Sequence, residues 1–586
     1  MGVPGLFMNL KKKYPDIVYK KDNEYLPYVL FFDFNCLIHP VCHLLWKDHS
    51  NDNIDTFEGK IINKSLEYLQ KIVDYAKPTK CGIFIDGVCP KAKMYQQRQR
   101  RFASFIDKME INEIKKRNNE EENKYYDTNS ITPGTKFMER FHKAILNYIN
   151  EKNKEKDMFF YSSYFETGEG EHKIIDYIKN ENNNLLDKEI MIYGLDADLI
   201  ILSLTLTQQY KIKLLRENKD VSLTELNMIV FDVNECQKSI ICELSQDEKS
   251  NDYGYVLDFI FITILLGNDF IPSCPTLNMR FFSKKNSSVN GYDLLMDTYK
   301  ELNQRIVIKF TDQLEINWSA FVELINRLSK FEQMYFETAR VNKNIESDEI
   351  VQRENMVFDF KDPLRMYDYN IDFKIRKLRY THHYFNYNVC KCSLNDRLFA
   401  SQLYNNKDIN DKFYLNKELE INEYEYNKVM IKYFNTIVFI MYYYFKGCPD
   451  NNYYYPYLSG ILLSDFYNYI KDNNLLTYAN KKFSKKKNTK IFPLQQLITV
   501  LPKQSYNLLP YNIKSYLLSN NKNILLENFI KNYLPDIQSI KRDFINKSKI
   551  YQANLILKMP YIDDINAIIG DIAISNDDIN RTLKIT

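Results

Sequence analysis

The sequence predicts an α/β protein whose central sheet, flanked by helices, carries acidic residues at the ends of its strands. Two apolar runs have the composition of buried strands, and they finish in Asp33 and Asp86. A third apolar run is followed closely by Asp196 and Asp198. Ligands of open α/β sheets bind just beyond the carboxyl ends of the strands. We therefore expect these acids to gather at one edge of the sheet.

A further acidic pair lies between the second and third of these strands. Glu169 and Glu171 are flanked by Gly168 and Gly170, and glycine lets the backbone come close to whatever the carboxylates hold. Acids that lack enough neighbouring bases usually bind hard metal ions. The alternative is a set of solvated acidic turns. It is disfavoured because the later pair of aspartates is embedded in apolar sequence, where a bare charge is costly.

Asp269 is one more candidate ligand. An apolar helix pattern over residues 252–266 leads to Gly267, Asn268 and Asp269, and Pro272 ends it. The helix dipole disfavours an acid at this end of a helix, so its presence there calls for a reason. An ordinary turn after the helix is the competing interpretation.

A basic helix face follows directly after Asp86. Lys93, Gln97, Arg100 and Arg101 are spaced so that they share one side of a helix. Such a face can hold a phosphate, because arginine offers forked hydrogen bonds and lysine a point charge. A solvated basic surface is the alternative, and the neighbouring Asp86 favours the functional interpretation.

Composition fits an ordinary intracellular globular protein. The 586 residues are 45% hydrophobic and 26% charged, with a formal net charge of +3, so nucleic-acid binding would need a local basic patch. Ten scattered cysteines suggest free thiols in a reducing compartment. The N-terminus lacks a signal-peptide pattern, and the apolar runs are too short for a bilayer. We expect no membrane among its partners.

Two other patterns could suggest binding sites. A zinc site drawn from four residues of the middle region is disfavoured because the spacing matches no standard site; those residues are His382, His383, Cys390 and Cys392. The basic run Lys481–Lys490 could help to hold a polyanion, although a solvated run is the favoured interpretation.

Taken together, the motifs resemble those of the Xrn 5′→3′ exoribonucleases, which are related through their PIN-like core to flap endonucleases. The matching segments extend in order over nearly the whole chain. They include MGVPGLF (1–7), FFDFNCLIHPVCH (31–43), FIDGVCPKAKMYQQRQRRF (84–102), GEGEHKIIDYI (168–178), YGLDADLIILSL (193–204), FITILLGNDFIPSCPTL (261–277), YYYFKGCP (442–449), LQQLITVLPKQSYNLLP (494–510) and YQANLILKMPYID (551–563).

The resemblance implies a site in which an acidic set binds two Mg²⁺ ions, with Mn²⁺ as a substitute. The set would be Asp33, Asp86, Glu169, Glu171, Asp196, Asp198 and Asp269. It also implies that the basic face (Lys93, Gln97, Arg100 and Arg101) holds the 5′-monophosphate of RNA in a closed pocket that excludes a cap or a triphosphate. His39 would stack on the first base. Tyr453 stands where the family has a stacking Trp, and would take that part.

The implied activity is processive 5′→3′ digestion of single-stranded, 5′-monophosphorylated RNA to nucleoside 5′-monophosphates. Residues 1–300 would form the catalytic domain, with a protruding charged helix near 93–130. Residues 301–370 would be a linker, and 371–586 would complete the pocket and the RNA channel. The chain resembles a compact form of the family without C-terminal extensions, which favours the cytoplasm and leaves the nucleus open. The resemblance also suggests decapping or RNA-decay factors as partners. The alternatives are a structure-specific 5′ DNA flap nuclease and an inactive RNA-binding scaffold.

Overall fold

A computed structural model places most of the chain. It describes residues 3, 5–21, 25–117, 119–218, 221–277, 290–332, 423–457, 460–487, 489–519, 523–537, 540, 542–543, 554–555, 557–570 and 572–585. No helix within these ranges combines the length and the apolar character needed to cross a membrane. The four residues of the disfavoured zinc site lie outside the described ranges.

The predicted sheet is present, with the order β1-β7-β6-β5-β2-β3-β4. The five strands from β6 to β4 in this order run parallel to one another, and β7 and β1 add antiparallel pairs at the other edge. The strands are β1 (Val18–Tyr19), β2 (Val29–Asp33), β3 (Lys80–Phe84), β4 (Phe159–Ser162), β5 (Glu189–Tyr193), β6 (Lys211–Glu217) and β7 (Met228–Asp232). The strand predictions around 28–33, 81–86, 190–193 and 228–233 are confirmed, and β1, β4 and β6 are additional.

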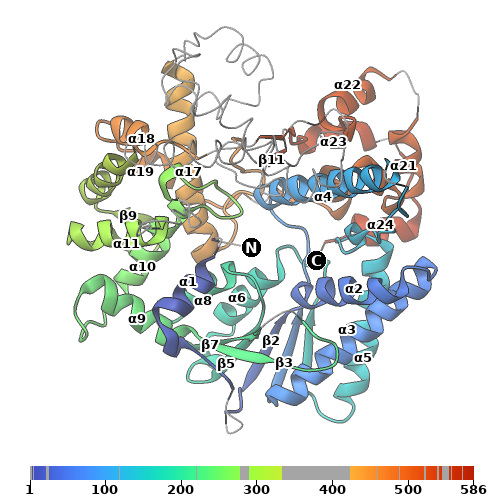
Figure 1. The fold of residues 1–586 in the computed structure, drawn as a ribbon, viewed down its shortest axis with the longest axis horizontal. Helices are drawn as coiled ribbons and strands as arrows, with labels where there is room; N and C mark the ends of the chain where they lie inside the picture. Colours follow the sequence, from blue (N-terminus) through green and yellow to red (C-terminus); the bar gives the residue numbers. More distant parts are fainter. Residues whose placement is uncertain are drawn as a thin grey trace, which may run out of the picture.

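Helices cover both faces of the sheet, as Figure 1 shows. Alternate residues of β2 separate the two layers: Phe32 packs with one group of helices and Phe31 with the other. The first group is α2 (Asn35–His49), α3 (Ile54–Ala76) and α5 (Lys136–Asn153). The second is α1 (Leu6–Lys13), α6 (Gly170–Asn180), α7 (Asn182–Leu185), α8 (Asp198–Leu204), α9 (Val233–Ser245), α10 (Gly254–Thr263) and α11 (Gly291–Leu302).

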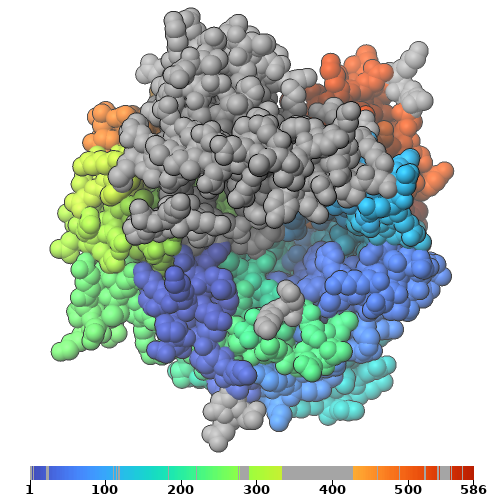
Figure 2. Space-filling view, in the orientation of Figure 1, coloured from blue at the N-terminus to red at the C-terminus, as the bar shows by residue number. Residues whose placement is uncertain are grey.

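The N-terminal helix α1 is fixed to this second layer. Lys13 and Tyr14 both contact the carboxylate of Glu243 on α9, and the Lys13 ammonium lies 5.3 Å from the centre of the Tyr292 ring on α11. Figure 2 shows the dark-blue N-terminal segment beside the green segment on this face of the molecule. The start of the chain is therefore packed against the helices of this layer.

The second region shares its core with the first. Helix α17 (Glu423–Lys446) is buried along most of its length, and its apolar residues join the same cluster as α10 and α11. The other elements are α18 (Leu463–Ile470), α19 (Leu476–Phe483), α20 (Pro493–Val500), α21 (Tyr511–Leu517), α22 (Ile524–Tyr533), β10 (Arg542–Asp543), β11 (Asn554–Leu555), α23 (Ile562–Ile569) and α24 (Asn576–Thr582). Helices α20 to α23 support α4 (Lys91–Arg117), which lies beside α21, α22 and α23 above the sheet in Figure 1.

The segment expected to be a linker, 301–370, is described only as far as residue 332. This part is folded rather than extended: it contains β8 (Val307–Phe310), β9 (Leu314–Ile316) and a helix over 318–332. Ile306 and Phe321 are completely buried. Residues 301–332 are therefore part of the packed core, because apolar side chains spaced along them face α10 and α17.

Candidate active site

Four neighbouring strands, β5, β2, β3 and β4, bring acids to one edge of the sheet. Asp33 is the last residue of β2, and Asp86 follows β3 by two positions. Asp196 and Asp198 follow β5, and Glu169 and Glu171 follow β4 at the start of α6. The strands are parallel, so their carboxyl ends coincide. The predicted gathering of these acids is what the structure shows.

Gly170 lies in the middle of this group. Its N–H donates a hydrogen bond to Asp86 Oδ1 at 2.7 Å. A Cβ at this position would lie 2.8 Å from Asp33 Oδ1 and 3.4 Å from Asp86 Oδ1. Because residue 170 is a glycine, the first turn of α6 lies against both carboxylates.

Lys93 links the acids to the basic helix. Its ammonium lies 2.7 Å from Glu169 Oε1 and 2.8 Å from Asp269 Oδ2. Asp269, which comes from the turn after α10, also accepts a hydrogen bond from Gln96 at 3.1 Å. Burial disfavours the charged ammonium, but the two carboxylates outweigh it and the pKa of Lys93 is raised. Lys93 therefore pairs directly with two of the acids and is not confined to a separate phosphate pocket.

Helix α17 contributes two tyrosines to the site. Tyr443 donates a hydrogen bond to Glu169 Oε2 at 3.0 Å. Tyr444 donates to Asp198 Oδ1 at 3.3 Å and accepts one from Asn268 at 3.1 Å. The second region therefore orients carboxylates of the first.

Burial and the neighbouring carboxylates raise the pKa values of several of these acids. Burial, followed by the charges of Asp86 and Asp196, raises the pKa of Asp33. Burial and Glu169 raise the pKa of Asp86 to about 6, while burial and Asp269 raise that of Asp198 to about 7. These shifts mean that the ionised cluster is short of positive charge.

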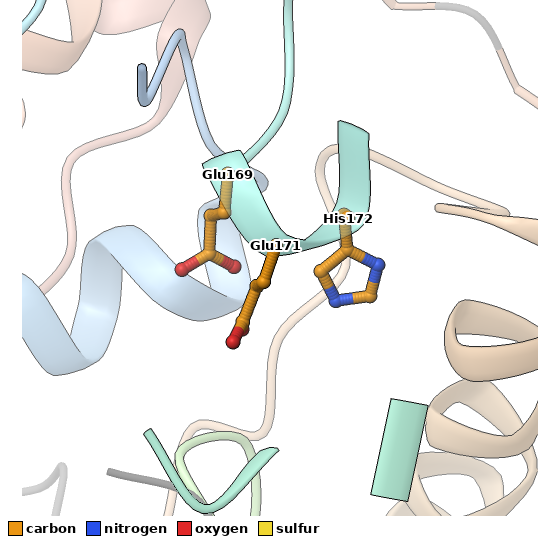
Figure 3. Close-up of side chains that lie close together, drawn as sticks. All are labelled: Glu169, Glu171 and His172. Atoms are coloured by element: carbon orange, nitrogen blue, oxygen red, sulfur yellow. The ribbon is translucent and has the colours of Figure 1, made fainter. Parts of the chain in front are cut away.

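The residues fit divalent cations. Glu171 Oε2 is buried and lacks a hydrogen-bond partner, as expected of an oxygen that serves as a ligand. Ligand atoms of Glu169, Glu171 and His172 lie within 4.8 Å of one another. Figure 3 shows the two carboxylates side by side on the first turn of α6, with the His172 ring further along it. Because burial lowers the pKa of His172, its imidazole is neutral. The many oxygen donors suit a hard divalent cation.

A cavity of about 1070 Å³ opens over the acids and runs along α4. The four residues of the basic face all line it: Lys93, Gln97, Arg100 and Arg101. One guanidinium nitrogen of Arg101, Nη1, is buried without a hydrogen-bond partner. Such an unmet donor suits an anion. The cavity also continues along α4 past Arg101 to Lys116. The closed pocket implied by the resemblance would end at Arg101.

His39, on α2, lines the same cavity. Burial and the nearby charge of Arg100 lower its pKa to about 3, so the ring is neutral. Gln97 accepts a hydrogen bond from Gln496 of α20 at 3.3 Å, and Gln496 in turn accepts one from the Cys89 N–H at 3.1 Å. Elements from both regions therefore position the basic end of the cavity.

Tyr453 does not join this cavity, and its predicted place opposite His39 is corrected. The side chain is 4% exposed, and its ring stacks on Phe439 with centroids 4.8 Å apart. Its hydroxyl is 2.9 Å from that of Thr436, and the Lys432 ammonium lies 3.8 Å from the ring centre. The ring lies in the core because it packs between Phe439 of α17 and Phe483 of α19.

Several side chains at the site were not among the residues predicted from the sequence. They are Cys36, which donates a hydrogen bond to Asp33 at 2.9 Å, and Tyr443, Tyr444, Gln96 and His172. All five lie inside motif segments that carry the family resemblance, so the motifs were the signal that could have pointed to them. Cys36 lies three residues after Asp33, and His172 follows Glu171. The tyrosines come from an apolar helix more than 200 residues away.

Comparison with known proteins identifies the same architecture. The model described as "XRN 5'-3' exonuclease N-terminus" matches residues 1–218, and the "Xrn1 helical domain" matches 249–367 and 395–574. The chain is 26% identical to human 5'-3' exoribonuclease 1, with 96% of this chain and 34% of that protein covered. It is 30% identical to the same-named protein of Saccharomyces cerevisiae (58% and 23% covered).

A third relative is the Drosophila melanogaster protein called 5'-3' exoribonuclease 2 homolog, which is 22% identical with 96% of this chain and 71% of that protein covered. The chain spans about a third of the human relative's length. The two domain models together account for most of the chain. Tyr443 and Tyr444, from the second matched region, reach acids of the first. The chain belongs to the XRN 5′-3′ exonuclease family.

Proposed function

We propose that this protein is a processive 5′→3′ exoribonuclease that digests single-stranded, 5′-monophosphorylated RNA to nucleoside 5′-monophosphates by a two-metal-ion mechanism. The observation that carries the proposal is one cavity lined both by six of the seven acids, all but Asp198, and by the cationic face of α4. Acids alone would suit many metal enzymes. An unmet arginine donor beside them suits a chain end that carries a phosphate.

The acidic set would hold two Mg²⁺ ions: Asp33, Asp86, Glu169, Glu171, Asp196, Asp198 and Asp269. Bound there, the ions would activate water and offset the charge of the scissile phosphate. Tyr443 and Tyr444 hold two of these carboxylates in place through their hydroxyl groups. Lys93 offsets charge between Glu169 and Asp269 until substrate enters.

The basic face sets the length of the product. Arg100 and Arg101 would hold the terminal phosphate while the next phosphodiester lies at the acids, so each cycle removes one nucleotide. His39 would stack on the first base. After cleavage the shortened RNA carries a new 5′-phosphate, which fits the same pocket and makes repeated digestion possible.

Both regions take part in this proposal. We assign residues 1–300 to the catalytic unit, because all seven acids lie there, and residues 371–586 to the walls of the pocket. Support comes from Tyr443 and Tyr444 on α17 and from Gln496 on α20, which reach the acids and the basic face respectively.

The test is digestion of uniformly labelled, 5′-phosphorylated single-stranded RNA with Mg²⁺ or with a chelator. We expect mononucleotides only with the metal. Asp198→Asn should abolish digestion while RNA binding persists, and Asp157→Asn serves as control because Asp157 is 88% exposed and distant from the site. Preferential cutting of a DNA flap would favour the nuclease alternative. Binding without metal-dependent release would favour the scaffold.

A further inference from the structure

His172 lies next to two of the proposed metal ligands, although it is not a member of the acidic set. Ligand atoms of Glu169, Glu171 and His172 lie within 4.8 Å of one another, and in Figure 3 all three side chains project to the same side of the first turn of α6. Metal–ligand bonds of about 2.1 Å place two ligand atoms of one ion at most about 4.2 Å apart. Small side-chain rotations would therefore bring the three donors to one ion. We call these three residues the α6 triad.

The local sequence is enough to assemble the α6 triad. Glu169 is the N-cap residue of α6, and its backbone is extended, with φ −76° and ψ 151°. His172 follows it by three positions, the spacing at which side chains share a face of a helix, and Glu171 lies between them on the same turn. The triad is thus set by one short motif and needs no distant segment to form.

The three side chains of the triad are buried, and two of them have unused ligand atoms. Glu169, Glu171 and His172 are 6%, 4% and 8% exposed. Glu171 Oε2 has no hydrogen-bond partner. Neither ring nitrogen of His172 forms a hydrogen bond with the residues that the structure describes. Buried polar side chains that serve only packing are normally hydrogen-bonded, so this pair of unused donors points to a ligand.

Tyr443 of α17 holds two members of the triad in place. Its hydroxyl donates a hydrogen bond to Glu169 Oε2 at 3.0 Å, and its ring centre lies 3.9 Å from that of His172. Neighbours that orient ligands in this way are typical of metal sites. Lys93 pairs with the other oxygen of Glu169. A carboxylate oxygen has more than one lone pair, so Oε2 can accept the Tyr443 hydroxyl and also bind an ion.

The triad lies at the wall of the cavity. Glu169 and Glu171 line the cavity, whereas His172 does not belong to the lining among the residues that the structure describes. An ion bound by all three would have its protein ligands on one side and the cavity on the other. Catalytic metal sites have this form, with three protein ligands and an open position for water or substrate.

The nitrogen donor determines which ion suits the triad. Mg²⁺ takes oxygen ligands and keeps several of its waters. Carboxylate oxygens suit Mn²⁺ as well as Mg²⁺, whereas an imidazole nitrogen suits transition metals. Two carboxylates with one imidazole therefore favour Mn²⁺ over Mg²⁺.

We propose that His172 is a direct ligand of one of the two metal ions, and that it makes the α6 triad selective for Mn²⁺ over Mg²⁺. This inference rests on the proposed function, because it adds one ligand to the proposed acidic set. The remaining acids supply only oxygen atoms and would hold the second ion, which can be Mg²⁺: Asp33, Asp86, Asp196, Asp198 and Asp269.

Pulsed electron paramagnetic resonance of bound Mn²⁺ tests the inference without RNA. The full-length chain is freed of metal with a chelator and titrated with Mn²⁺, and coupling between the bound ion and an imidazole nitrogen is recorded. We expect this nitrogen coupling in the wild type. Calorimetric titrations of the same protein with each metal should show tighter binding of Mn²⁺ than of Mg²⁺.

Variants at position 172 assign the nitrogen. His172→Gln replaces it with an oxygen donor, so the coupling should disappear while Mg²⁺ affinity changes little. Mn²⁺ affinity should fall by at least about tenfold, because changes beside metal ligands already cost about 10–100-fold. His172→Phe keeps a ring against Tyr443 but has no donor, and it should also lose the coupling.

His142→Gln is the matched control. His142 lies on α5, half-buried, with Nδ1 3.1 Å from the hydroxyl of Tyr161, and α5 covers the other face of the sheet. This variant should keep both the nitrogen coupling and the Mn²⁺ affinity of the wild type. Melting temperatures establish that each variant is folded.

Four results would overturn the inference. Bound Mn²⁺ without nitrogen coupling in the wild type would exclude an imidazole ligand, while metal-dependent digestion of RNA would leave the proposed function standing. Coupling that persists in both variants at position 172 would belong to another histidine. Equal affinity for the two metals would refute the selectivity. Failure to bind either metal, together with failure to digest RNA, would refute the proposed function and this inference with it.

Discussion

Replacing Gly170 with alanine tests the arrangement of the acids most directly. The added Cβ would lie 2.8 Å from Asp33 Oδ1 and 3.1 Å from the carbonyl oxygen of Phe84. Both approaches are closer than ordinary van der Waals contact. The carbonyl belongs to the sheet and cannot easily move, so the first turn of α6 or the carboxylate of Asp33 must shift instead.

The expected loss of metal affinity follows from the proposed ligands on and beside that turn. Glu169 and Glu171 flank Gly170, and its N–H donates to Asp86, so one shift disturbs several proposed ligands at once. Changes next to metal ligands typically lower metal affinity by about 10–100-fold. We expect a loss at the upper end of this range, together with a higher Mg²⁺ concentration for half-maximal digestion.

Isothermal titration calorimetry of Mg²⁺ or Mn²⁺ binding, combined with RNA digestion at increasing metal concentration, measures this effect. Gly59→Ala is the matched control, because a Cβ there meets nothing within 4 Å and the residue lies inside α3. Alanine should stabilise that helix by about 0.5–1 kcal/mol without changing metal dependence. Unchanged metal affinity and activity in Gly170→Ala would refute the close packing of acids around this glycine.

Three further predictions concern other parts of the site. Arg101→Ala should remove the preference for 5′-monophosphate over 5′-hydroxyl RNA, measured as the ratio of the two digestion rates. Because the pKa values of Asp86 and Asp198 are raised to about 6 and 7, the metal-free folded state binds more protons than the unfolded chain, whose aspartates titrate near about 4. Its stability should be greatest below that pH and fall as pH rises through 6 and 7, as thermal melting across pH would show. Mg²⁺ should reverse most of this fall. Tyr443→Phe removes the hydrogen bond to Glu169 and should weaken Mg²⁺ binding by about tenfold, as calorimetry can measure.

Each of these has a result that would contradict it. An unchanged rate ratio in Arg101→Ala would separate this arginine from the terminal phosphate. A metal-free protein that becomes more stable between pH 5 and about 7.5 would contradict the raised pKa values. For the tyrosine, Tyr442→Phe is the control, because its hydroxyl bonds to Asn480 rather than to an acid; equal effects in the two variants would mean that Tyr443 acts only through packing.

Strand ends were readable from the sequence because they combine two local signals. An apolar run followed by an aspartate identifies both a buried strand and a polar position at its end, as with Asp33 and Asp86. The helical spacing of Lys93, Gln97, Arg100 and Arg101 likewise depends only on residues close together in the chain. Tyr453 shows the limit: its place in a motif suggested a stacking role, but packing against Phe439 determines where the ring lies.

The sequence by itself therefore determined the α/β class, the acids at the sheet edge and the cationic face of α4, since each depends on local periodicity. The tertiary structure alone decided that Tyr443 and Tyr444 hold those acids, that Lys93 lies between Glu169 and Asp269, and that the cavity continues to Lys108. These contacts join segments as much as 274 positions apart. Long-range packing of this kind arises from the shapes of buried side chains, and no repeating pattern along the chain records it.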